Sequence, residues 1–408
     1  MSSVGPGQTE PLPAAAHTVA AADTLRRASR AMLAGNFAIG CGVMVIAGSL
    51  NDLVSSLQVS VAVGGQLISV GAVAMAVGAP LMAVLWGGMD RRQLLTLALV
   101  WYAVGHAISA LMPSFATLLP VRAAAVLGAA VFTPQAAAAI NVLAPPAERG
   151  RAMTFIFLGW SVASVVGMPL HAWIGETFGW RWAFALVSLL SVAAAVAVWR
   201  TVPHGVRPPP LSLKGWGRVL TNPLLMGLVA VTVLSGAAQF TLFSYMAPYY
   251  RRVLGAGPET VSLLFMWFGA FGLLGNLLLT RYIDRLGPAR CVNTGLLLMA
   301  VAMLAWPWAH SVPLMAVALV PWALGGFASN SAQQARVSAA SPTSASALLA
   351  LNTSAIYVGQ ALGAASGGAV LAASGFGTLH HAALAFMGAA IVLSLWLGRR
   401  MQAGVVHD

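Results

Sequence analysis

The chain has 408 residues, of which 59% are hydrophobic and only 7% charged, whereas a soluble globular protein carries roughly a quarter charged residues. So few charges cannot cover a surface in water, and this composition excludes a water-soluble fold. The net charge of +12 would suit nucleic acid. However, most Lys and Arg residues stand at the ends of apolar stretches, so no nucleic-acid partner is expected.

Twelve apolar segments are long enough to cross a bilayer, and each is free of charge at its centre. A spanning helix needs about 20 mostly apolar residues to cross roughly 30 Å of hydrocarbon. In chain order the segments are 32–54, 64–86, 94–112, 116–141, 152–175, 180–201, 223–248, 259–280, 291–310, 312–334, 345–373 and 379–398. This predicts an all-α polytopic membrane protein with twelve transmembrane helices.

The basic residues fall beside alternate ends of these segments. Arg91 and Arg92 follow the second segment, for example, and Arg149 and Arg151 follow the fourth. Loops rich in Lys and Arg face the cytoplasm in membrane proteins. We therefore expect both termini in the cytoplasm and a multi-pass protein of the cytoplasmic (inner) membrane.

The longest polar interruption separates the sixth segment from the seventh and carries Pro208, Pro209 and Pro210. A proline-rich polar stretch of this kind is typical of a linker. We predict a disordered cytoplasmic tail over 1–30, an N-terminal six-helix bundle over 31–202, a cytoplasmic linker over 203–222, a C-terminal six-helix bundle over 223–400 and a cytoplasmic tail over 401–408.

Matching features recur in the two predicted bundles. Asp90 follows the second segment and Asp284 follows the eighth, each with an arginine after it, at an offset of 194 residues. Gly167 in the fifth segment matches Gly363 in the eleventh at an offset of 196 residues. Two repeated six-helix bundles with a substrate site between them are typical of alternating-access transporters.

Several motifs together resemble the major facilitator superfamily, in its drug:proton antiporter (DHA1) branch and near the arabinose and sugar efflux permeases. They are Asp90-Arg91-Arg92, Arg122, Glu148-Arg149-Gly150-Arg151, Gly159-Trp160-Ser161 through Gly167-Met168-Pro169, and Gly179-Trp180-Arg181-Trp182-Ala183-Phe184. The resemblance covers nearly everything after about residue 30. It implies two bundles of six helices each that transport a small molecule by rocking about a central cavity.

The resemblance implies two sets of gating residues. Loops of the Asp-Arg type tie the cytoplasmic ends of helices together, and a Gly-Pro helix bends and seals the cavity. The candidates are Asp90, Arg91, Arg92, Asp284 and Arg285 in the loops, and Gly159, Gly167 and Pro169 in the fifth segment. The loop arginines could instead serve as topology signals alone, and the glycines could serve ordinary close packing.

Arg122 stands out because a guanidinium inside a membrane span costs at least about 2.5–3.5 kcal/mol unless it faces a cavity or a partner. One interpretation is a cavity charge that orders the fourth helix or meets the substrate or a proton carrier. The other is an arginine that reaches outward or is held by backbone carbonyls. Its match to an arginine of the family in the same span favours the first.

The acidic group that carries the proton in many relatives is missing from the first span, where Val43 occupies the matching position. None of the nine acidic residues lies near the middle of a span. Asp52 comes nearest, although it could equally be an ordinary acid at a helix end. Our candidates for proton coupling are Asp52, Arg122 and His171, and His106 is a further histidine within a span.

Polar and aromatic residues within the cavity-lining spans are the substrate-binding candidates, together with Arg122. They are Asn36, Asn51, Gln135, Trp160, Gln239, Tyr245, Trp267, Asn330, Gln333, Asn352, Tyr357 and Gln360. Amides in hydrocarbon must pair, so some of these residues will bridge helices instead. A cavity with a fixed positive charge and no central acid favours a neutral or anionic amphipathic substrate.

The sequence thus predicts a secondary active transporter that exports a drug, sugar or metabolite by alternating access, with proton antiport. A uniporter, an importer or a non-transporting receptor on the same fold are the alternatives. No set of catalytic or metal-binding residues and no ATP-binding motif occurs, so an enzyme and a cofactor are not expected. The expected partners are a small-molecule substrate, protons and membrane lipids, and we expect a monomer.

Overall fold

The computed structural model describes residues 14–86, 88–146, 148–207, 217, 219–341 and 345–404. Within them it contains helices and no strands. The α-helices are α1 (Ala14–Ser56), α2 (Val61–Leu85), α3 (Arg91–Ala110), α4 (Phe115–Ala125), α5 (Leu127–Leu143), α6 (Arg149–Val162), α7 (Met168–Thr177), α8 (Trp180–Thr201), α10 (Pro223–Phe243), α11 (Met246–Arg252), α12 (Pro258–Leu286), α13 (Pro288–Ala305), α14 (Val312–Ala340), α15 (Ala345–Ser374) and α16 (Leu379–Gly404).

The helices provide twelve spans that are long and apolar enough to cross a membrane, which confirms the predicted number and order. Several spans are interrupted. The fourth consists of α4 and α5, and the seventh of α10 and α11. The ninth ends in the 3₁₀ turn η2 (Trp306–Trp308), and the twelfth begins with the 3₁₀ turn η4 (Phe376–Thr378).

The fifth span contains a π-helical turn, η1 (Ala163–Gly167), between α6 and α7. Pro169 stands two residues after the end of this turn. A proline inside a helix has no N–H to donate, and its ring clashes with the carbonyl four residues earlier, here that of Val165. Widening the turn before the proline relieves that clash, which accounts for the π-helix at this place.

The first helix begins earlier than predicted. We predicted a disordered tail over 1–30, but α1 starts at Ala14. Alanine has the highest helix propensity, and this stretch is rich in it. An ion pair at helical spacing adds to this, with Arg27 at 2.6 Å from Asp23. At the other end, α16 continues to Gly404 into the predicted tail over 401–408. Residues 1–13 and 405–408 lie outside the described part of the chain.

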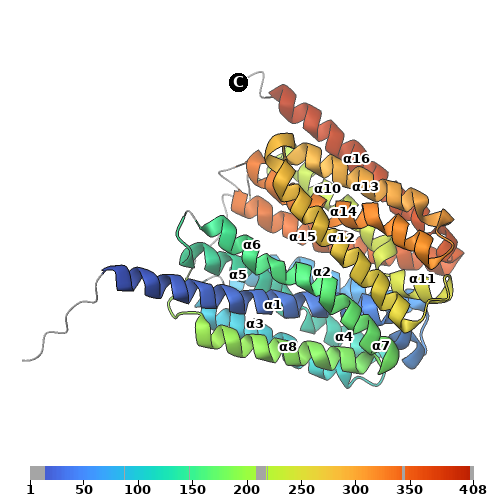
Figure 1. Cartoon of the computed structure of the whole chain (residues 1–408), viewed down its shortest axis with the longest axis horizontal. Helices are drawn as coiled ribbons and strands as arrows, with labels where there is room; N and C mark the ends of the chain where they lie inside the picture. The colour runs from blue at the N-terminus through green and yellow to red at the C-terminus, as the bar shows by residue number, and fades with distance from the viewer. Residues whose placement is uncertain are drawn as a thin grey trace, which may run out of the picture.

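The helices form two groups that lie side by side (Figure 1). Helices α1 to α8 form one group, in blue to green, and α10 to α16 form the other, in yellow to red. Of the predicted linker over 203–222, residues 208–216 and 218 are outside the described residues. The limits of the two bundles therefore remain a prediction.

The same helix contact recurs in both groups. Asn36 of α1 donates to the carbonyl of Ile156 in α6 at 3.0 Å. Thr232 of α10 donates to the side chain of Asn352 in α15 at 2.6 Å. In each pair the residues are 120 positions apart, and the second pair follows the first at the offset of 196 seen in the sequence. The packing of the first span on the fifth is thus repeated by the seventh on the eleventh.

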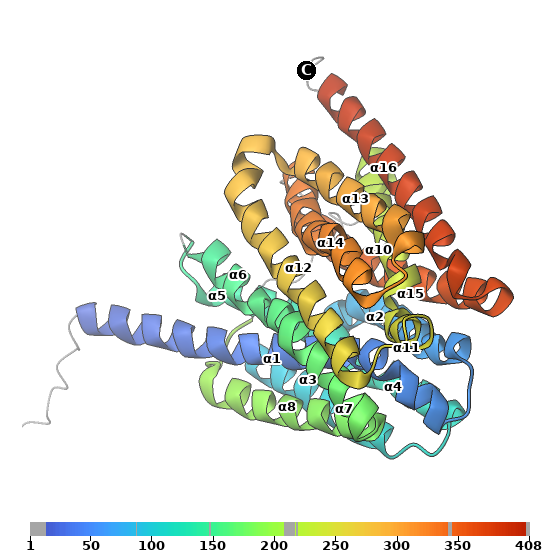
Figure 2. The ribbon, with the colours of Figure 1, turned by 45° about the vertical axis from the view of Figure 1, so that its right-hand side comes forward.

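The two groups contact each other through α2 against α15 and through α12 against the fifth span. Helix α12 packs against η1 and α7 but barely touches α6, and Figure 2 shows it diverging from α6. The polar links that we find between the groups, within the described chain, are Asn51 to Ala247, Ser262 to Pro169 and Arg251 to Glu176. All three lie in the half of the bundle that the positive-inside rule places outside.

Glycine permits the closest helix contacts within the first group. A Cβ on Gly159 of α6 would lie 2.4 Å from the carbonyl oxygen of Leu33 in α1, whereas one on Gly150 of the same helix would meet nothing within 4 Å. The backbones of α1 and α6 could not stay at their present separation with any side chain at Gly159.

We expect Gly159→Ala to destabilise the protein by about 1–3 kcal/mol, because α1 and α6 must separate to admit the methyl group. Gly150→Ala carries the same gain in helix propensity without the clash and should be neutral or stabilising. The difference is measured by thermal unfolding of the purified variants in detergent, with size-exclusion chromatography as the readout of the folded fraction. Equal midpoints for the two variants would mean that α1 and α6 are not tightly packed.

Candidate functional site

Arg122 of α4 is buried, with 2% of its surface exposed. Its guanidinium donates to the backbone carbonyl of Gly42 in α1 at 2.8 Å and lies 2.9 Å from Nε2 of His106 in α3. Both contacts come from within the first helix group. Arg122 therefore joins α1, α3 and α4 and does not extend toward the second group.

The hydrogen bonds of His106 define its protonation. Its Nδ1 lies 2.8 Å from the backbone carbonyl of Tyr102, which can only accept, so Nδ1 carries the hydrogen. Nε2 of a neutral ring is then free to accept from Arg122, which can only donate. The Tyr102 hydroxyl in turn donates to the carbonyl of Ile39 at 3.1 Å. The cluster thus holds one positive charge, which carbonyls and a neutral imidazole stabilise.

Of the two interpretations of Arg122, the geometry fits the one in which backbone carbonyls hold it, with His106 as an additional acceptor. The spacing of Tyr102 and His106, four residues apart in one span, was a signal for such a partner. Sequence reasoning could not assign it, because the register of α3 against α4 decides which side chain faces Arg122.

Asp90 caps the start of α3, where its carboxylate accepts from the N–H of Arg92 at 3.0 Å. It also accepts from the N–H of Gly205 at 2.6 Å, and the N–H of Arg91 donates to the carbonyl of Val206. These bonds fasten the loop between α2 and α3 to the segment after α8, within the first group.

The other loop candidates have different surroundings. Arg92 stacks over the ring of Trp199 at 4.3 Å, which is a favourable cation–π contact. Arg285 is exposed at the end of α12. The side chain of Asp284 lies outside the described residues. A gating role for these loops remains a prediction.

Asp52 is engaged at a helix start. Its carboxylate accepts from the N–H of Trp180 at 2.7 Å, where α8 begins after Gly179 in a left-handed conformation with φ of 102°. This favours the helix-end interpretation of Asp52. His171 of α7 is fully buried, and neither ring nitrogen has a hydrogen-bond partner among the residues that the structure describes.

Glu176 near the end of α7 is the acidic side chain that sequence reasoning missed. It is 6% exposed, accepts from the side chain of Asn51 and lies 4.0 Å from Arg251 of the second group. Arg251 and Arg252 were the signal that could have found it. Two arginines on the external side depart from the positive-inside pattern and call for an acidic partner there.

The three Gly-Pro candidates all lie where the fifth span contacts other helices. Gly159 and Gly167 touch α1, where a Cβ on Gly167 would lie 2.4 Å from Sγ of Cys41. Close packing is therefore part of their role. The carbonyl of Pro169, in contrast, accepts from the hydroxyl of Ser262 in α12 at 2.9 Å and so contributes to the seam between the groups.

The substrate-binding candidates divide into paired and unpaired side chains. Those that already bond within the protein are Asn36, Asn51, Gln239, Tyr245, Trp267, Gln333 and Asn352. Those for which we find no hydrogen bond to a described residue are Gln135, Trp160, Asn330, Tyr357 and Gln360. Among the unpaired side chains, Gln135, Tyr357 and Gln360 are buried, with 8%, 7% and 4% exposed.

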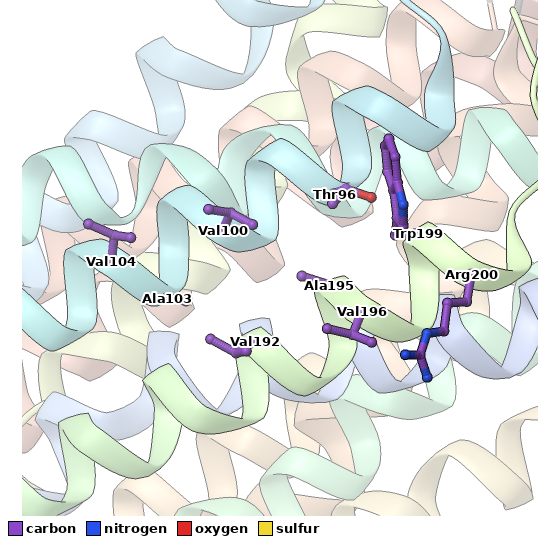
Figure 3. A pocket seen from close by; sticks show the side chains of 9 residues that line it. All are labelled: Thr96, Val100, Ala103, Val104, Val192, Ala195, Val196, Trp199 and Arg200. Atoms are coloured by element: carbon purple, nitrogen blue, oxygen red, sulfur yellow. The ribbon is translucent and has the colours of Figure 1, made fainter.

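A groove between α3 and α8 contains none of the predicted site residues (Figure 3). Its walls are mostly valine and alanine, with Trp199 and Arg200 at one end. Val100, Val104 and Val192 are all more than two-fifths exposed, so the groove opens outward from the bundle. In a bilayer this face contacts lipid acyl chains.

Twelve membrane-spanning helices in two repeated groups are the architecture of a class of membrane transporters. The family model of the Major Facilitator Superfamily matches residues 32–257 and 231–405. The chain belongs to this superfamily and is a multi-pass transporter of the inner membrane. This confirms the family that the motifs indicated, while the drug:proton antiporter branch remains a prediction.

The chain is similar to the inner membrane transport protein YdhP of Escherichia coli strain K12. The two are 30% identical over 344 residues, which covers 84% of this chain and 88% of the relative. It is 26% identical over 342 residues to a probable sugar efflux transporter of Pasteurella multocida, covering 84% and 82%. The crystal structure of a D-xylose-proton symporter shares the fold with a TM-score of 0.73 at 17% identity, covering 91% and 96%.

We expect Arg122→Met to lower the unfolding temperature of the protein, measured in the absence of substrate. The substitution leaves the Gly42 carbonyl and His106 without a donor, at a cost of about 1–3 kcal/mol for each buried group. Thermal unfolding in detergent measures this effect. An unpartnered cavity charge would give the opposite sign, because its removal relieves a desolvation cost.

Proposed function

We propose that this transporter exports a small neutral or anionic amphipathic molecule by alternating access, in exchange for protons. The observation that carries the proposal is that the polar links between the two groups lie at one end. Three polar links join them in the external half, and α12 stands away from α6 on the other side. This supports a carrier that is closed outside in this state and exchanges cargo with the cytoplasm.

The proposed substrate class rests on the side chains that the fold leaves available. Gln135, Tyr357 and Gln360 are buried without hydrogen-bond partners that we find in the described residues. They offer amide and hydroxyl groups suited to hydroxyl-rich or weakly polar molecules. None of the acidic side chains that the structure describes lies near the middle of a span, which disfavours a cationic cargo.

The names of the relatives point the same way. One relative is named a probable sugar efflux transporter, and one similar structure is a D-xylose-proton symporter. Export, a sugar-like cargo and proton coupling are each represented among proteins of this fold. On this proposal the chain belongs to the drug:proton antiporter branch and acts as a monomer in contact with lipids.

Proteoliposomes test the direction of coupling. With a panel of neutral sugars and aromatic carboxylates, we expect the transported compound to accumulate in vesicles with an acidic lumen, because outward proton flow drives its entry. A protonophore should abolish the accumulation. Accumulation of the compound inside vesicles whose exterior is acidic would identify a symporter. Flux that is insensitive to the pH gradient would identify a uniporter.

Gln360→Ala should raise the half-saturating concentration of the transported compound by about three- to tenfold, because one hydrogen bond is worth roughly 0.5–1.5 kcal/mol. Gln93→Ala is the matched control, since Gln93 is exposed at the start of α3. Initial rates in the same vesicles give both values. Equal half-saturating concentrations would remove Gln360 from the binding site.

A further inference from the structure

Glu176 lies at the external end of the contact between the two helix groups. It belongs to α7 of the first group, its side chain is 6% exposed, and α11 of the second group approaches it through Arg251. It is one of nine acidic residues in the chain. Among the acidic side chains that the structure describes, it is the one in an ion pair between the groups.

Asn51 connects this carboxylate to the second group. The two hydrogens of its side-chain amide go to different groups. One is donated to Glu176, and the other to the carbonyl of Ala247 in α11 at 3.2 Å. Asn51 and Ala247 are 196 residues apart, which is the repeat offset, so the bond joins equivalent positions of the two groups. The carboxylate thereby fixes the orientation of the amide that bridges them.

The direct ion pair is the weaker of the two connections. Its nitrogen and oxygen atoms are 4.0 Å apart, and the Arg251 side chain is 48% exposed, so water and salt screen the attraction. A hydrogen bond to an ionised carboxylate is about twice as strong as one between neutral groups. The bridge through Asn51 therefore depends on the charge of Glu176 more than the arginine contact does.

We propose that Glu176 is the protonatable residue of an external gate. In its ionised form the carboxylate holds the groups together through Asn51 and Arg251. A proton taken from external water adds to one carboxylate oxygen and gives a neutral acid, which attracts Arg251 no longer and accepts more weakly from Asn51. The external side then opens, and the gate closes again when that proton leaves.

The other arginines and acidic residues near this end bond elsewhere or are exposed. Asp52 accepts from the N–H of Trp180, and Arg181 donates to the carbonyl of Met112 at 3.0 Å and to the hydroxyl of Ser56. Arg252 and Glu259 are exposed. In the described structure none of these four side chains bonds Glu176, so its protonation acts on Asn51 and Arg251.

This inference rests on alternating access, and it can be tested without a substrate. Spin labels at Gln58 and Val253, both exposed and one in each group, report the external separation in a Cys41→Ser, Cys291→Ser background in nanodiscs. We expect acidification from pH 8 to pH 4, through the range in which carboxyl groups ordinarily titrate, to increase the open population. In Glu176→Gln the open-to-closed ratio at pH 8 should be about tenfold higher, from the loss of a bond to a charged group, and it should no longer depend on pH.

Glu259→Gln is the matched control and should keep the pH response, since Glu259 is an exposed acid at the same end. Asn51→Ala should open the gate at pH 8 even though it removes no charge. A pH response that persists in Glu176→Gln, or is absent from the unsubstituted protein, would overturn the inference. Proton-driven flux that is unchanged in Glu176→Gln would overturn it too, while leaving the exporter function intact. A pH-sensitive gate in a protein whose flux ignores the gradient would support the gate and refute antiport.

Discussion

A polar group inside the membrane can find a hydrogen-bond partner only in the protein or in a water-filled cavity, because hydrocarbon offers none. Arg122 shows how the fold meets this constraint at one position. Its charge is met by a carbonyl of α1 and an imidazole of α3, so one side chain fixes three helices. Asn36 does the same for α1, α5 and α6, where it donates to Ile156 and accepts from Thr133. Polar residues here determine the register that apolar packing alone leaves open.

The internal repeat extends this constraint from each group to the whole molecule. Each group satisfies its polar residues largely by itself, so few bonds are needed between the groups. Those few are concentrated at the external end, where Ser262, Asn51 and Arg251 meet their partners. A carrier must break the contacts between its halves in every cycle. A small number of bonds, confined to one end, keeps the free-energy difference between its two states small.

The twelve helices were predictable because length and apolar composition decide whether a segment can span a bilayer. The start of α1 could not be predicted in this way, because the Ala-rich stretch from Ala14 lacks the apolar content used to find spans. It forms a helix through its helix propensity. The roles of the site residues were harder to predict than the helices. Asp52 and Glu176 lie at external helix ends in much the same sequence context, but one caps α8 and the other lies at the seam. Helix register decides between those roles, and hydropathy does not report it.

The two sides of the seam between α12 and the fifth span differ in their chemistry. On one side it consists of main-chain atoms, namely the carbonyls of Ser164 and Pro169. On the other it depends on the absence of a side chain at Gly269 and on the hydroxyl of Ser262. A main-chain surface is the same whatever residue supplies it. Mutational tolerance at this seam should therefore be asymmetric, with substitutions at Gly269 and Ser262 of α12 more costly than substitutions at Ser164 opposite them.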